Sequence, residues 1–378
     1  MTPRERLITA TKHKEPDFVP CSPWNNAQFP SKVQRIPLEI YDGALGVRDY
    51  AWFWKQQLET DKRFHFDSVI ISPNCIGGGQ FVPYLTHSNC KVTTETIEKP
   101  GGKGWVKITL ATPAGNLIEE RAFVKDSSDY CTSHIYKDVE QDFEKMKYTF
   151  PEPEEINVDL HLDAQREIGE QGLLMLGFDT PWTWWIMKRG SVGFTDPFDY
   201  PKKMEEFTEW YTNYIIRYIH YFDQFNPDIY WVHGVDDSFG GPKFLDKYVY
   251  NFIKRIRRET KTHLKHFHSG RMSKFLEKEV EAGVDIIEIL EPPPMGDIDL
   301  KEAKKRVGND IVLSGNLDPI NVLERGTRQE IEEAVKRCLD AAAEGGGYIF
   351  STADQITHLT PFKNVEIMVE AVKKFGKY

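Results

Sequence analysis

Histidine, aspartate and glutamate recur at the ends of several short apolar runs of this chain. His233 ends one run and His268 ends the next, Glu291 follows a third just before three prolines, and Asp354 follows the last. Imidazole and carboxylate groups bind zinc and transfer protons at neutral pH. If the runs are parallel strands, these side chains meet at one edge of a sheet, where a catalytic zinc would need three of them and one open position.

The same residues also have structural interpretations. Asp236 and Asp237 could simply cap the helix that follows their strand. His266 and His268 are two residues apart, so both point to one face, either inward or toward the helices. Glu288 is one step out of phase and is expected to face the helices or to be paired in the core.

Other polar and aromatic residues near the strand ends leave two interpretations open. Glu291 could be a loop residue held by backbone amides, and Asp354 could cap the last helix. The cluster of Trp182, Trp184 and Trp185 could belong to the core, or it could form an aromatic wall for a flat ring or a methylated cation.

These side chains need elements to position them, and the chain alternates short strands with amphipathic helices. Such alternation predicts a parallel sheet with right-handed crossovers, and eight units predict a closed (β/α)8 TIM barrel with its active site on the loops after the strands. We expect one α/β domain over residues 1–378. The expected strands are Phe18–Ser22, Asp67–Ser72, Leu173–Phe178, Asp228–His233, Leu264–His268, Asp285–Leu290, Asp310–Ser314 and Tyr348–Ser351. The expected helices include Asp49–Glu59, Lys202–Phe222, Lys243–Glu259, Met272–Ala282, Arg328–Ala343 and Asn364–Phe375.

One segment departs from the alternation. Between about residues 88 and 136, alternating runs are separated by Pro-Gly-Gly and Pro-Ala-Gly-Asn turn signals. The pattern predicts a small antiparallel sheet inserted after the second strand. It could cover the mouth of the barrel, or it could be a peripheral addition.

Composition excludes several classes of protein. The net charge is -10 without a basic stretch, which argues against nucleic acid as a partner. No apolar run is long enough for a bilayer, and the polar N-terminus lacks a signal-peptide core. The five scattered cysteines predict reduced thiols and a cytoplasmic location. The phosphate-binding, dinucleotide-binding and nucleophile-elbow motifs are all missing from the sequence.

Several segments together resemble the uroporphyrinogen decarboxylase superfamily, and within it the cobalamin-dependent methyltransferase branch. They are the opening MTPRERLITATKHKEPDFVP, then His268-Ser-Gly, LEPPPMGDIDL, VLSGNLDP, GTRQEIEEAVKRCLDAAAEGGGYIFSTAD and the closing TPFKNVEIMVEAVKK. The resemblance covers nearly the whole chain. It implies the barrel fold and chemistry on a tetrapyrrole or on a methyl donor.

The departures from the family pattern narrow this expectation. The loop SPWNNAQFPSK lacks the arginines of true decarboxylases, and Asn74 stands near the position of their acidic residue, where an amide cannot donate a proton. The methyltransferase branch holds zinc with His-x-Cys after strand five and Cys after strand eight. Here those positions read His266-Phe-His268 and Asp354, a harder ligand set that suits oxygen donors. The resemblance therefore favours relatives that demethylate ethers.

We accordingly expect a zinc-dependent methyltransferase that passes a methyl group from a small donor, such as a methyl ether, to cob(I)alamin on a corrinoid partner protein. His268, Glu291 and Asp354 are the expected metal ligands. The expected catalytic residues, of which the first three are also reserve ligands, are His233, Asp236, Asp237 and Asn74. The expected donor-binding residues are Trp24, Asp179, Trp182, Trp185 and Asn316.

Two alternatives stay open. The first is a metal-free decarboxylase or lyase in which His233, His268 and Asp237 handle protons. The second is a barrel that binds a tetrapyrrole or corrinoid without catalysis.

Overall fold

Two β-sheets organise the protein. The computed structural model describes residues 1–36, 50–76, 88–97, 104–122, 130–235 and 241–378. One sheet has seven parallel strands in the order β1-β6-β7-β8-β9-β10-β11, and the other has four antiparallel strands. The parallel strands are β1 Ser68–Ile71, β6 Gly172–Asp179, β7 Ile229–Gly234, β8 His263–His268, β9 Ile286–Glu288, β10 Val312–Leu317 and β11 Tyr348–Thr352.

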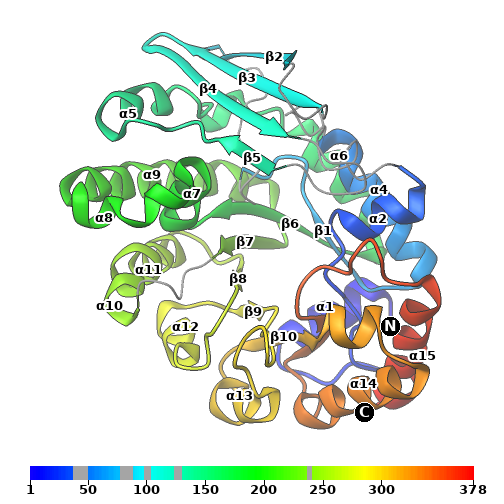
Figure 1. Cartoon of the computed structure of the whole chain (residues 1–378). Coiled ribbons are helices and arrows are strands. Elements are labelled where there is room, and N and C mark those ends of the chain that lie inside the picture. The colour runs from blue at the N-terminus through cyan, green and yellow to red at the C-terminus, as the bar shows by residue number, and fades with distance from the viewer. Residues whose placement is uncertain (37–49, 77–87, 98–103, 123–129, 236–240) are drawn as a thin grey trace.

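Helices cover the outer face of the parallel sheet (Figure 1). Every residue of β6 is buried, as expected for a parallel strand packed on both faces. The helices are α1 Pro3–Thr11, α2 Gln28–Gln34, α4 Tyr50–Phe64, α5 Val139–Lys147, α6 Asp159–Ile168, α7 Pro181–Arg189, α8 Asp196–Asp199, α9 Pro201–Phe222, α10 Pro242–Leu245, α11 Asn251–Glu259, α12 Leu276–Ala282, α13 Leu300–Val307, α14 Arg328–Ala342 and α15 Phe362–Phe375. No helix in these described ranges is long and apolar enough to cross a membrane.

The two faces of the sheet carry separate cores. Alternate side chains of the strands point inward and form one apolar cluster, which α1 joins through Leu7 and Ala10. The other strand residues point outward and pack on the helices. The inward set includes Val69, Ile71, Leu173, Met175, Ile229, Trp231, Phe267, Ile286, Val312 and Ile349.

Seven of the eight expected strands are present, and the first is reduced to isolated bridges. Cys21 forms a parallel bridge with Phe350 of β11. Its carbonyl also accepts a 2.8 Å hydrogen bond from the amide of Asp67, just before β1. The segment that contains Cys21 therefore contacts both edges of the curled sheet, while a regular eighth strand is not seen there.

The inserted antiparallel sheet is confirmed, with strands β2 Lys91–Ile97, β3 Trp105–Thr112, β4 Gly115–Ala122 and β5 Tyr130–Ser133. It lies beyond α5, outside the helical layer (Figure 1). Lys137 donates to the Ile118 carbonyl at 3.1 Å, and the Tyr136 amide donates to the Lys188 carbonyl of α7 at 3.1 Å. These bonds tie the sheet and the segment after it to the helical layer, and a role in covering the mouth stays a prediction.

The helix expected over Lys243–Glu259 is interrupted by a π-helical turn, Asp246–Tyr250, between α10 and α11. Tyr248, Val249 and Tyr250 are all buried. The amphipathic pattern of the sequence did not predict this wider turn.

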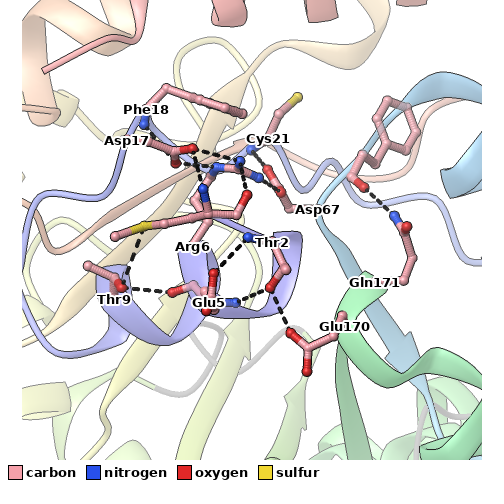
Figure 2. A network of polar contacts seen from close by, with 12 residues as sticks. Thr2, Glu5, Arg6, Thr9, Asp17, Phe18, Cys21, Asp67, Glu170 and Gln171 are labelled. Carbon is pink, nitrogen blue, oxygen red and sulfur yellow. Dashed lines mark hydrogen bonds and ion pairs between the residues drawn. The ribbon is translucent and has the colours of Figure 1, made fainter.

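A buried ion-pair network fixes α1 to the amino-terminal end of the sheet (Figure 2). Thr2 and Glu5 form a capping box that starts α1. Arg6 binds Asp17 at 2.8 Å and also pairs with Asp67, whose other oxygen accepts from the Cys21 amide at 2.8 Å. Burial raises the pKa of Asp67 to about 6, and Arg6 opposes this rise.

Replacing Arg6 with methionine should destabilise the fold by about 2 kcal/mol, because Asp67 loses its buried counter-charge. The pKa of Asp67 would rise further above its ordinary value, so stability should fall as pH increases through that pKa. Urea unfolding at pH 5 and pH 8 tests this, with a larger loss expected at pH 8. Arg166→Met, which removes an exposed pair with Asp163, is the matched control. An equal loss in both variants would contradict the prediction.

Candidate active site

Five ionisable side chains gather on the inner face of the sheet, toward the carboxyl ends of the strands. We call Asp179, His233, Lys265, Glu288 and Asp354 the inner polar group. Asp179 lies opposite His233 in the strand register, His233 opposite Phe267, and Phe267 opposite Glu288. Parallel pairing therefore sets Asp179, His233 and Glu288 in one row across four neighbouring strands, from β6 to β9.

His233 and Asp179 form a buried pair within this group. The Nδ1 atom of His233 lies 2.8 Å from Oδ1 of Asp179. A carboxylate in this position fixes the orientation and tautomer of an imidazole. The other ring nitrogen, Nε2, is then the atom that can accept or donate a proton.

Lys265 and Glu288 form a second buried pair, from β8 to β9. Burial raises the pKa of Glu288, and Lys265 counteracts the rise. The charge of Asp354 raises the pKa of Glu288 while that of His233 lowers it, so the four side chains act on one another. Burial also raises the pKa of Asp354.

Three aromatic rings pack beside the inner polar group. The ring centroid of Trp24 lies 5.3 Å from that of Trp231 and 5.5 Å from that of Phe267. The Nζ atom of Lys265 lies 5.8 Å from the centroid of Trp24. The Trp24 amide donates to Thr352 Oγ1 at 3.1 Å, which ties this loop to β11. Trp24 was expected to bind the donor, and the structure places it beside the inner group.

The two histidines at the end of β8 point the other way, toward the helices. Nδ1 of His266 lies 2.8 Å from one oxygen of Glu279, and Nδ1 of His268 lies 2.9 Å from the other. The Tyr250 hydroxyl donates to the same carboxylate at 3.0 Å. Burial alone would raise the pKa of Glu279, but the two histidines hold it well below its usual range.

The expected metal ligands are not brought together. Among the described residues, the only three potential ligands whose binding atoms lie within 4.8 Å of one another are His266, His268 and Glu279. Glu291 instead accepts a hydrogen bond from the Gly270 amide, in agreement with the alternative that backbone amides hold this loop residue. Asp354 belongs to the inner group and accepts from the Gln355 amide at 2.6 Å. The physical reason is that His268 lies on the helix-facing side of β8, opposite in direction to Lys265 and Phe267.

Trp182 and Trp185 belong to the helical layer rather than to the inner face. Trp185 donates from Nε1 to Asp196 at 2.7 Å, and Trp182 packs edge-on against Phe244 with centroids 4.6 Å apart. Both residues follow β6 on α7, whose buried side packs on α9. The core interpretation therefore describes them, and the rings that lie beside the inner polar group are those of Trp24, Trp231 and Phe267.

Of the remaining candidates, Asn316 lies in β10, Asn74 follows β1, and two others fall outside the described residues. Asn74 donates to the Asn157 carbonyl at 3.0 Å, and Asn316 donates to the Leu290 carbonyl at 3.1 Å. These amides support neighbouring loops, and their catalytic and binding roles remain predictions. Asp236 and Asp237 fall outside the described residues.

Sequence reasoning missed the Lys265–Glu288 pair. Glu288 was expected to face the helices or be paired in the core; it is paired, but on the inner face. A lysine inside the run His-Leu-Lys-His-Phe-His was the available signal, because a buried lysine needs a carboxylate partner.

Enzymes of the barrel-like α/β class place their active sites at the carboxyl ends of parallel strands, where this sheet carries its ionisable groups. The family model described as uroporphyrinogen decarboxylase (URO-D) matches residues 134–375. This match covers more than half of the chain, so the protein belongs to the URO-D family.

Similar proteins include both kinds of enzyme expected from the family. A uroporphyrinogen decarboxylase of Methylobacillus flagellatus is 37% identical over 98 residues, 26% of this chain and 26% of that protein. The methylcobamide:CoM methyltransferase MtbA of Methanosarcina mazei is 40% identical over 78 residues, 21% of this chain. The aligned stretch thus spans about a quarter of the first relative's length. The solved structure of a methyltransferase from Methanosarcina mazei has the same fold, with a TM-score of 0.68, 16% identity and coverage of 99% of both chains.

Proposed function

We propose that this protein is a methyltransferase that moves a methyl group from a small methylated donor to a corrinoid carried by a separate protein. The observation that carries the proposal is the charge of the inner polar group, in which Lys265 is outnumbered by Asp179, Glu288 and Asp354. A decarboxylase must bind an anionic substrate, which such a group repels. The likeness of one stretch to a methylcobamide:CoM methyltransferase also supports methyl transfer.

The inner polar group has the parts that this reaction needs. The corrinoid of the partner supplies the cob(I)alamin nucleophile that accepts the methyl group. As the methyl group leaves, its heteroatom gains an electron pair, and an ether oxygen would also need a proton. His233, held by Asp179, is positioned to supply a proton from Nε2, and Glu288 and Asp354 have pKa values raised by burial.

Zinc was expected to polarise the donor, but the described residues do not assemble the predicted ligand set on the inner face. The group that does assemble, His266, His268 and Glu279, faces α12, and its carboxylate already accepts three hydrogen bonds. No step of the proposed reaction therefore passes through zinc. Elemental analysis of the wild type and of His268→Ala tests the zinc expectation. Near-stoichiometric zinc that is lost in the variant would support it, and no zinc in either protein after incubation with zinc would refute it.

Replacing His233 with glutamine should slow methyl transfer from an ether donor by about 100-fold, because general acid–base groups contribute rate factors of this order. The assay follows loss of cob(I)alamin absorbance with a panel of methylated donors. His220→Gln, which changes an exposed histidine on α9, is the matched control and should retain the wild-type rate. Decarboxylation of a porphyrinogen, with no methyl transfer, would instead favour the decarboxylase alternative. Corrinoid binding without either reaction would favour the non-catalytic barrel.

A further inference from the structure

Three polar atoms on the inner face lack a hydrogen-bond partner among the described residues. They are Oε2 of Glu288, Nε1 of Trp231 and Oγ of Ser351, and all three are buried. Trp231, Glu288 and Ser351 each lie two residues after an inward-facing isoleucine of the same strand, namely Ile229, Ile286 and Ile349. Since residues two apart on a strand point to the same face, all three side chains point inward. Buried polar groups in native proteins almost always find partners, so these atoms indicate a ligand. Its polar groups would include a donor for Glu288 and an acceptor for Trp231.

The charges beside these atoms favour a cation. Glu288 is only 1% exposed and has one cationic neighbour, Lys265, while Asp354 adds a second negative charge nearby. Asp179 is already bonded to His233. Two carboxylates in one buried space disfavour each other's ionised form, and a bound cation removes that penalty.

The aromatic rings favour the same type of ligand. Trp24, Trp231 and Phe267 border the inner polar group, and a cation over a tryptophan face is attracted by the ring electrons. Lys265 already places an ammonium group over Trp24. Rings and carboxylates together are the chemistry that recognises methylated ammonium groups.

We propose that the methyl donor is a small organic cation, an N-methylated ammonium compound, held by Glu288, Asp354 and the Trp24 ring. This inference rests on the proposed function. In the transfer, the C–N bond breaks and its electron pair stays on nitrogen, so the donor leaves as a neutral amine. The methyl carbon forms its new bond with the electron pair of the corrinoid Co(I). No proton is required for this leaving group, so both carboxylates can stay ionised.

The test compares three probes that differ in charge and methylation but little in shape. N,N-dimethylethanolammonium carries a charge and an N–H, choline carries a charge alone, and 3-methyl-1-butanol is the neutral isostere of the first. Binding is measured by calorimetry and by quenching of tryptophan fluorescence at neutral pH. We expect both cations to bind at least about tenfold more tightly than the alcohol. Equal or tighter binding of the alcohol, or no binding of any probe to the folded protein, would overturn the inference.

Variants assign the binding to this site. Glu288→Gln and Asp354→Asn should each weaken cation binding by about tenfold and leave binding of the alcohol unchanged. Glu277→Gln, on the exposed side of α12, should change neither. Thermal unfolding of each variant shows that it is folded. If both inner variants bind the cations normally, the inference fails.

The methyl-transfer assay separates this inference from the proposed function. Cation binding without methyl transfer from any donor would refute the methyltransferase and leave the cation site standing. Transfer from a neutral ether but not from an ammonium donor would refute the cation site and leave the methyltransferase standing.

Discussion

Replacing Glu279 with leucine should lower the free energy of unfolding by about 3–5 kcal/mol. The carboxylate of Glu279 joins His266, His268 and Tyr250 in a fully buried group, so its loss leaves two imidazoles and one hydroxyl without their acceptor. Unpaired buried polar groups are costly because water cannot replace the missing bond. Chemical denaturation followed by circular dichroism measures the loss.

Glu277→Leu is the matched control for this prediction. It lies on the same helix and pairs with Arg306 at the surface, where ion pairs contribute about 0–1 kcal/mol. The pH dependence gives a second readout. The pKa of Glu279 is held below its usual value in the folded protein. The stabilisation that Glu279 provides is therefore fully present at pH values above its ordinary pKa, and it is lost as the pH falls toward the lowered pKa. A loss in Glu279→Leu no larger than in the control would contradict the network's role.

Replacing Lys265 with methionine should also cost about 3–5 kcal/mol, because Glu288 would be left as an unpaired buried charge. Glu288→Leu should have a similar cost. The double variant should be more stable than the sum of the two losses predicts, since a well-packed apolar pair replaces a buried ion pair with little penalty. Denaturation of the four proteins gives the coupling energy. Strict additivity would show that the two side chains do not interact.

The fold was largely predictable from sequence because its signals are local. Apolar runs and amphipathic stretches placed seven strands and the inserted sheet. Phe18–Ser22 was the exception. Its apolar pattern resembles a strand, but its backbone makes only isolated bridges at the sheet edges.

The site was predicted less well, because it depends on which face of a strand points inward. The spacing of His266 and His268 showed that they share a face, but only the register of β8 with its neighbours decides which face that is. Their partner Glu279 lies on a helix and gave no strand-end signal. Trp182 and Trp185 follow a strand closely, yet α7 turns them into the helical layer.

The π-helical turn at Asp246–Tyr250 has a consequence for how this protein tolerates changes in length. The turn contains one residue more than an α-helical turn, and it ends at Tyr250, which donates to Glu279. Deleting one residue there would restore a regular helix but rotate its two halves relative to each other by about 100°. Either α10 or the Tyr250 hydroxyl would then leave its contacts. This segment should therefore accept substitutions on its solvent side far more readily than a deletion.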